Sequence, residues 1–246
     1  MKYQKTYSVR VFECDPSTKL SFSSLLNYMQ DIAADHTVEL KITIPELFKR
    51  GLTWMLSRYH ISVSRYPAYM EKIIFKTWIA EHKGMFSIRD YSMETEDGEI
   101  LALITSSWVL YDLKNKNIVN VEILDLGCYA LPERAIDDHF SSLKTPEEIQ
   151  HTIDLEIRKH DIDINRHANN RVIVELALEG LPLDFLNNHE LIDLEITFKG
   201  QAFYGTTVTS ASQINKDLEQ SVCLHHITNS ENGKSIAIAR THWITT

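Results

Sequence analysis

The sequence predicts an α+β protein made of two tandem repeats, each combining a central helix with an antiparallel sheet. Two observations lead to this prediction. Residues 95–109 match residues 230–244, with Gly, Ala and Trp at the same places. In addition, each half contains an apolar stripe at helical spacing, followed by runs in which apolar and polar residues alternate. A helix of this kind buries its stripe against one face of a sheet.

The duplication is clearest near the end of each repeat. There, an Asp-Gly or Asn-Gly pair, which tolerates positive φ, precedes a long final strand. Earlier in each repeat, residues 14–22 align with 162–170 at an offset of 148, thirteen more than the offset of 135 at the end. We place these extra residues of the first repeat at 39–51, where Pro45 and Gly51 predict a short additional helix. The matched positions are Gly98 and Gly233, Ala102 and Ala237, and Trp108 and Trp243.

Each repeat is predicted to run from a strand through the helix to four antiparallel strands. Ser21 and Asn169 are expected to cap the two central helices. The apolar stripes are Leu25, Leu26, Met29, Ile32 and Ala33, and Ile173, Leu176, Ala177, Gly180 and Leu181. The predicted strands are 53–65, 72–81, 86–94 and 100–112, then 191–202, 206–214, 219–229 and 235–245. The predicted domains are 1–127, a charged connector at 128–150, and 151–246.

Composition narrows the class of protein. The 246 residues are 43% hydrophobic and 24% charged, which is ordinary for a soluble globular protein. No apolar run is long enough to span a bilayer, and the N-terminus lacks a signal-peptide core. A net charge of −9 disfavours nucleic acid as a partner. Three cysteines without paired spacing argue against disulfides and a metal site, so we expect a cytoplasmic protein without membrane attachment.

The most informative segment is 161–170, D-I-D-I-N-R-H-A-N-N, between a strand-like run at 152–158 and a helical run at 172–181. Asp163, Asn165 and His167 occupy alternate positions, so on extended backbone their side chains point the same way. Asp can act as base or nucleophile, His can move protons, and Asn can hold a water or a carbonyl. The trio therefore predicts hydrolysis or acyl transfer, although isolated polar residues before a helix are commonly caps and turn formers.

Three segments together resemble one protein family. They are W-M-L-S-R-Y-H-I-S-V-S-R-Y-P at 54–67, W-V-L-Y-D at 108–112, and the segment at 161–170. In this order they resemble the acyl-acyl-carrier-protein thioesterases of plants and bacteria, and the last is similar to that family's catalytic D-x-N-x-H-x-N-N segment. The resemblance covers nearly the whole chain. It implies a double hotdog fold, in which a strongly curved antiparallel sheet wraps the helix of each repeat.

The resemblance implies hydrolysis of the thioester between a fatty acyl chain and the phosphopantetheine arm of acyl carrier protein. This is a reaction of fatty acid biosynthesis, with acyl carrier protein as partner and without a cofactor. It makes Asp163, Asn165 and His167 catalytic. The acid that the family carries on the strand after the helix aligns with Gln201, whose amide can orient a water but cannot accept its proton. Either Asp163 or His167 is then the base, or the register is shifted by one residue.

The first repeat has Asp15, Ser17 and Lys19 at the equivalent positions, so it lacks the trio. We therefore interpret it as the acyl-binding half. Trp54 and Met55 are expected to contact the substrate there, with ordinary core packing as the alternative. The duplicated tryptophans at 108 and 243 are interpreted as structural.

Several alternatives stay open at this point. Backbone N–H groups of Ala168, Asn169 and Asn170 at the start of the second helix are candidates to stabilise the oxyanion. Either a water held by Asn165 attacks the thioester with His167 as base, or Asp163 attacks directly. The alternative functions are an acyl-coenzyme A thioesterase, for which no phosphate-binding glycine loop is present, and a non-catalytic acyl-binding or sensor module. We expect a monomer or a homodimer.

Overall fold

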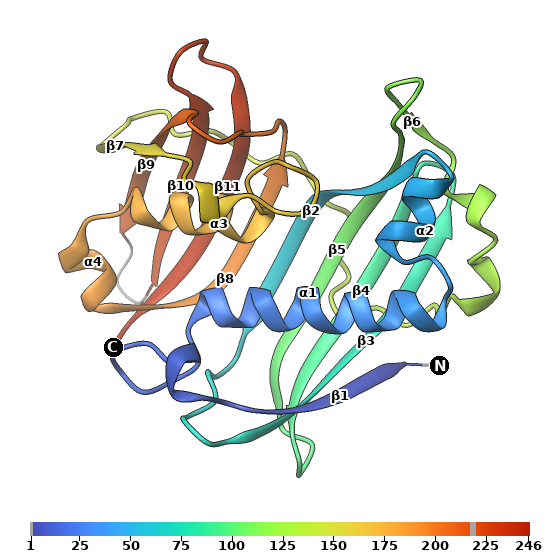
Figure 1. Ribbon diagram of the computed structural model, residues 1–246. Helices are drawn as coiled ribbons and strands as arrows, with labels where there is room; N and C mark the ends of the chain where they lie inside the picture. The colour runs from blue at the N-terminus through green and yellow to red at the C-terminus, as the bar shows by residue number, and fades with distance from the viewer. Residues whose placement is uncertain (1, 217–219) are drawn as a thin grey trace. The chain divides into compact units, whose positions relative to one another are not determined.

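The computed structural model describes residues 2–216 and 220–246 (Figure 1). The chain divides into two compact units, Met1–His139 and Phe140–Thr246. The boundary between them falls inside the predicted connector at 128–150. No helix in the described ranges is both long and apolar enough to cross a membrane.

In the first unit, one long helix lies across an antiparallel sheet. The strands β1 (Tyr3–Ser8), β3 (Lys72–Lys83), β4 (Phe86–Thr95), β5 (Ile100–Asp112) and β2 (Leu52–Val63) are neighbours in that order, and β6 (Asn117–Val119) pairs with β5. The helices are α1 (Phe22–Glu39) and α2 (Ile44–Lys49), with short 3-10 turns at Val11–Glu13, Val121–Leu124 and Gly127–Tyr129. Figure 1 shows α1 crossing one face of this sheet.

The second unit repeats this plan. Its strands β7 (His151–Glu156), β9 (Thr207–Lys216), β10 (Gln220–Asn229), β11 (Ser235–Thr245) and β8 (His189–Phe198) are neighbours in the same order as their counterparts. The helices are α3 (Asn170–Glu179) and α4 (Leu183–Asn187), and a 3-10 turn, Lys159–Asp161, precedes the loop before α3. The predicted fold class and the duplication are therefore confirmed.

The central helices form where caps and apolar stripes predict them. Ser21 accepts a hydrogen bond from the N–H of Ser24, and Asn169 accepts one from the N–H of Arg171, so both predicted caps are confirmed. The buried residues of α1 include Leu25, Leu26, Met29 and Ile32, and those of α3 include Val172, Ile173, Val174 and Ala177. Burial of these stripes against the sheets is the main stabilising term of each unit.

Two predicted boundaries are wrong. The strand predicted at 191–202 ends at Phe198, because the N–H groups of Lys199 and Gly200 both turn to the carbonyl of Ile236. The extra residues of the first repeat do not all lie at 39–51. The helix α1 has 18 residues against 10 in α3, and the second unit has its own short helix α4 where the first has α2. For the strand predicted at 219–229, Glu219 lies outside the described residues.

The first part of the connector is tied to its own unit. Asp90 is fully buried and accepts hydrogen bonds from Nε of Arg134 at 3.1 Å and from the N–H of Ala135 at 2.7 Å. The indole of Trp78 donates to the carbonyl of Glu133 at 2.8 Å. These contacts explain why residues without regular structure hold one path along the sheet.

Candidate active site

The loop that carries Asp163, Asn165 and His167 is a compact turn. The N–H of Asp163 donates to the carbonyl of His167 at 2.9 Å, and the N–H of Arg166 donates to the carbonyl of Asp163 at 3.0 Å. Arg166 has a φ of 67°, in the left-handed region. The prediction that the three side chains alternate along extended backbone and point the same way is therefore wrong.

The Asp163 side chain is the physical reason for the turn. Its Oδ1 accepts from the N–H of Asn165 at 2.7 Å, and its Oδ2 accepts from Nδ2 of Asn165 at 3.4 Å. A bond from an Asp side chain to the backbone two residues on offers the chain an alternative to the strand ladder. The turn thereby brings the carboxylate and the amide of the predicted trio into contact, with both side chains half-buried.

His167 is positioned by a different neighbour. Its ring meets the ring of Phe203 edge-on, with centroids 5.8 Å apart and planes at 73°. Within residues 2–216 and 220–246, the imidazole of His167 makes no hydrogen bond to the carboxylate of Asp163, so only the backbones of these two residues are joined. Sequence analysis does not identify Phe203, although an aromatic residue directly after the aligned strand end, next to Gln201 and Ala202, is a usable signal.

The loop is fixed to the segment 200–206 by backbone hydrogen bonds near both of its ends. The N–H of Ile157 donates to the carbonyl of Thr206 at 2.9 Å, and the N–H of Ala168 donates to that of Ala202 at 2.8 Å. Ala202 is 2% exposed, so this second attachment is shielded from water. The segment after β8 therefore decides where the residues next to His167 lie.

A buried carboxylate supports the start of the loop. Asp161 accepts from the N–H of Arg158 at 2.7 Å and from its guanidinium at 3.3 Å. Burial alone raises the pKa of a carboxyl group, but the donors of Arg158 outweigh it and hold the pKa of Asp161 below its usual value. The carbonyl of Asp161 accepts from the N–H of Asn169 at 2.8 Å, so Asp161 also fixes the start of α3.

Gln201 lies beside this arrangement but not on a strand. It is exposed, three residues beyond the end of β8 at Phe198, and it directly precedes Ala202, which the loop contacts. Its placement on a strand is a wrong prediction. Its assignment to the position of the family's acid stays a prediction.

The three candidate oxyanion donors are not equivalent. The N–H groups of Ala168 and Asn169 already donate to the carbonyls of Ala202 and Asp161. Asn170 is the first residue of α3, where backbone N–H groups have no partner within the helix. Asn170 therefore stays a candidate backbone donor, whereas the N–H groups of Ala168 and Asn169 hold the loop in place.

The first unit contains the same turn without the trio. Asp15 Oδ1 accepts from the N–H of Ser17 at 2.9 Å and from its hydroxyl at 2.6 Å. The N–H of Asp15 donates to the carbonyl of Lys19 at 2.8 Å, and Thr18 has a φ of 62°. An Asp-centred turn is therefore a property of both repeats.

Trp54 and Met55 lie half-buried on β2. Trp54 packs against a core cluster that includes Leu47 of α2, and its ring meets that of His82 edge-on at 6.4 Å. Burial lowers the pKa of His82, so the imidazole beside Trp54 is uncharged near neutral pH. The duplicated tryptophans each donate to a hydroxyl two residues earlier: Trp108 to Ser106 at 2.8 Å and Trp243 to Thr241 at 2.7 Å.

Comparison with known families gives one family for both units. Residues 1–125 match the family description Acyl-ACP thioesterase N-terminal domain, and residues 144–245 match Acyl-ACP thioesterase C-terminal domain. A chloroplast acyl-[acyl-carrier-protein] hydrolase, FATB3, of Cuphea viscosissima is 26% identical over 99% of this chain. A chloroplast dodecanoyl-[acyl-carrier-protein] hydrolase of Cinnamomum camphora is 24% identical over 98% of it. The chain spans 62% of the length of the first relative and 67% of that of the second.

Solved structures show the same fold. The 12:0-ACP thioesterase of Umbellularia californica superposes with a TM-score of 0.90 at 23% identity, covering 100% of this chain and 94% of that one. A putative oleoyl thioesterase of Lactobacillus plantarum gives 0.87 at 23% identity, covering 100% and 96%. The expected double hotdog fold is thereby confirmed.

Proposed function

The chain belongs to the acyl-ACP thioesterase family, and on that basis we propose that it hydrolyses the thioester joining a fatty acyl chain to acyl carrier protein. The products are a free fatty acid and the carrier with its phosphopantetheine thiol. The observation that carries the proposal is the loop before α3, which holds an acid, an amide and an imidazole next to a helix start. Relatives that align with 98–99% of this chain are named as hydrolases of this substrate class.

In the proposed mechanism, water is the nucleophile. Asn165 holds the water, and His167 takes its proton as the oxygen attacks the thioester carbon. The resulting oxyanion accepts from the N–H of Asn170, at the positive end of the α3 dipole. When the carbon–sulfur bond breaks, the proton held by His167 passes to the leaving thiolate.

Direct attack by Asp163 is the less favoured route. Both of its carboxylate oxygens accept hydrogen bonds from Asn165, and this engagement stabilises the carboxylate relative to an attacking state. The same turn in the first unit, which lacks the trio, also uses an Asp in this way. We therefore assign Asp163 to positioning Asn165, and Gln201, beside the loop, to orienting the water in place of the family's acid.

As part of the same proposal, the first unit serves as the acyl-binding half, with Trp54 and Met55 contacting the chain. Both are apolar and half-buried, so they retain surface that a chain can cover. Transfer of each methylene group out of water contributes about 0.8 kcal/mol, so acyl length is expected to affect turnover strongly.

The proposal is tested by measuring thiol release from dodecanoyl-acyl carrier protein and from dodecanoyl-coenzyme A. We expect faster hydrolysis of the carrier-linked substrate, and loss of that hydrolysis in His167→Ala. Lys19→Ala changes the equivalent position of the first unit and is the matched control. Faster release from the coenzyme A thioester would move the assignment to an acyl-coenzyme A thioesterase. Binding without release from either substrate would identify an acyl-binding module.

A further inference from the structure

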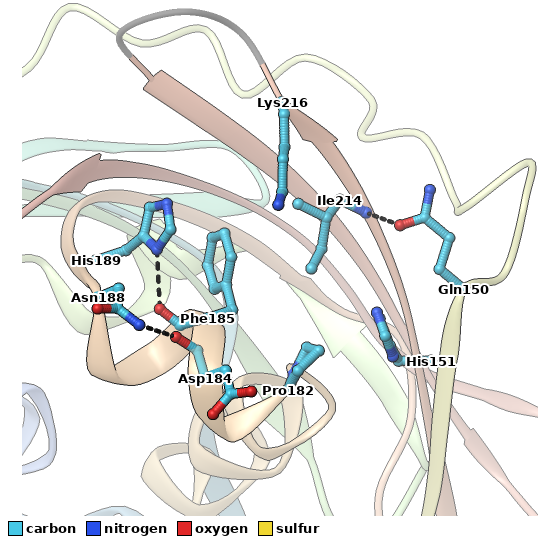
Figure 2. Close-up of a pocket in the computed structure, with 9 residues that line it drawn as sticks. All are labelled: Gln150, His151, Pro182, Asp184, Phe185, Asn188, His189, Ile214 and Lys216. Carbon is cyan, nitrogen blue, oxygen red and sulfur yellow. Dashed lines mark hydrogen bonds between the residues drawn. The ribbon is translucent and has the colours of Figure 1, made fainter.

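The second unit has a pocket of about 690 Å³ beyond the end of α3 (Figure 2). The loop that carries Asp163, Asn165 and His167 precedes the other end of this helix. The walls of the pocket come from α4, from β9 and from the start of β7 and β8. The helix α3 has 10 residues and so separates the two places by about 15 Å along its axis. The volume falls within the range of small-molecule sites in proteins.

The corresponding place in the first unit is filled by the chain itself. Ile79 on β3 corresponds to Ile214 on β9, at the offset of 135 that relates the repeats. Ile79 is 2% exposed, because it packs in a cluster with Leu47 of α2 and with Val121 and Leu124 from the turn after β6. In the described part of the second unit, Ile214 borders the pocket and is half-buried. The pocket is thus the unfilled counterpart of a packed core.

The floor of the pocket is apolar and well supported. Phe185 of α4 is 6% exposed, stacks on the ring of His189 with centroids 4.0 Å apart, and meets Trp243 edge-on at 5.4 Å. The Nδ1 of His189 donates to the carbonyl of Phe185 at 2.9 Å, which fixes the orientation of the imidazole. A floor held in this way keeps its shape when a ligand binds.

The rim carries positive and neutral polar groups. Figure 2 shows the Lys216 side chain descending from β9 with its ammonium group beside Ile214. Lys216 forms no ion pair among the described residues. His151, at the start of β7, lines the pocket farther along β9, opposite Ser212. Asp184, the acidic residue of the lining, lies on α4, below Phe185 in the view. The site therefore offers an apolar surface that ends at a cation.

We propose that this pocket binds a free fatty acid, with its carboxylate at Lys216 and its hydrocarbon chain against Phe185 and Ile214. A single ammonium group above an apolar floor complements an amphiphile with one negative charge. The source of the ligand rests on the proposed function, because that reaction releases a free fatty acid. Binding itself does not require turnover, so the two proposals fail independently.

The experiment uses dodecanoate carrying a photoreactive diazirine on its chain, with the cross-linked peptides of the full-length protein identified by mass spectrometry. We expect adducts on α4 and β9 in the wild-type protein. Lys216→Glu should reduce them about fivefold or more, since an attraction is replaced by a repulsion, whereas Lys216→Arg should retain them. Lys199→Glu, which changes an exposed lysine outside the pocket, is the matched control.

Two results would overturn the site. Equal labelling of α4 and β9 in Lys216→Glu and in the wild type would show that no cation recognises the carboxylate there. Labelling of these elements by the corresponding diazirine alcohol as strong as by the acid would show a non-specific apolar surface. A protein that labels as expected but hydrolyses no thioester would contradict the proposed function and leave the site intact.

Discussion

The loops before α1 and before α3 share one backbone and differ in their chemistry. In each, the N–H of an Asp donates to the carbonyl four residues on, at 2.8 Å for Asp15 and 2.9 Å for Asp163. In each, the third residue after that Asp has left-handed backbone: Thr18 has a φ of 62° and Arg166 has a φ of 67°. Both loops are also tied at 2.8 Å to the segment after a strand, through the carbonyls of Pro67 and Ala202.

This agreement separates what folds the loop from what reacts. The Asp is present in both loops and accepts the N–H two residues on in both, so the turn accounts for its presence. Within the predicted trio, the positions that differ are Ser17 against Asn165 and Lys19 against His167. For the proposed hydrolysis, the comparison therefore favours the amide and the imidazole as the reacting groups and a positioning role for the carboxylate.

The largest expected effect is at the positions that differ. His167→Ala and Asn165→Ala should each lower turnover by about a hundredfold or more, the usual scale for a positioned acid–base group. The melting temperature should stay within a few degrees, because both side chains are half-buried in a surface loop. Steady-state thiol release with a melting curve for each variant makes the measurement. Near-normal turnover in either folded variant would contradict the assignment.

The shared Asp provides the next test. In Asp163→Asn the retained Oδ1 still accepts from the backbone of Asn165, but the new amide nitrogen opposes Nδ2 of Asn165. Turnover should therefore fall by about tenfold or more without loss of stability. Asp15→Asn should change neither, since Oδ1 alone holds that turn. A loss of activity in a folded Asp15→Asn variant would contradict the assignment of the reacting groups to the second unit.

The sequence predicts those features of the fold and of the site that depend on residues close together along the chain. The caps at Ser21 and Asn169 and the stripe of α1 depend on neighbours along the chain, and they are predicted correctly except that Ala33 is only half-buried. The stripe predicted for α3 is correct in part: Ile173 and Ala177 are buried, but Gly180 and Leu181 lie beyond the end of the helix. The end of β8 and the attachment of Ala168 to Ala202 depend on segments far apart in sequence. Gly200 marks the end of β8 in the sequence. The structure gives the reason for a glycine there, because a Cβ would lie 2.9 Å from the carbonyl oxygen of Ser235.

A buried histidine in each unit makes stability depend on pH. Burial lowers the pKa of His225 to about 4, and burial together with the nearby Arg89 guanidinium lowers the pKa of His36 to about 4. Unfolded histidine titrates near pH ~6.5. Because these pKa values are lower in the folded state, protonation below pH ~6.5 favours the unfolded chain. The free energy of unfolding should therefore fall as pH drops from ~6.5 toward 4, by up to about 3 kcal/mol for each histidine.

Melting temperatures measured between pH 7.5 and 4.5 test this dependence. His225→Gln and His36→Gln should each flatten the profile, whatever their effect on stability at neutral pH. His160→Gln is the matched control, because its side chain is 69% exposed. An unchanged slope in both buried-site variants would show that other groups cause the acid loss.

Trp54 and His189 occupy equivalent positions of the two repeats, at the offset of 135. Trp54 borders the packed cluster of the first unit, and His189 borders the pocket of the second. Trp54→Ala removes a ring from the edge of a packed cluster and should destabilise the protein by about 2 kcal/mol. If the ring also contacts the acyl chain, the ratio of turnover on dodecanoyl and hexadecanoyl substrates should shift. A common loss on both lengths would restrict Trp54 to core packing. His189→Ala should leave that ratio unchanged.

The smallest expected effect is at Gln201. It is exposed, so Gln201→Glu adds a carboxylate beside the loop with little cost in stability. If Gln201 stands where relatives carry an acid, the new group can accept the proton of the attacking water, and turnover at neutral pH should be kept or raised by a few fold. The pH–rate profile should gain an acidic limb near pH ~4 to 5, where an unperturbed Glu titrates. Abolished turnover in a folded variant would show that the amide itself is required, and that this member orients its water without a carboxylate at that position.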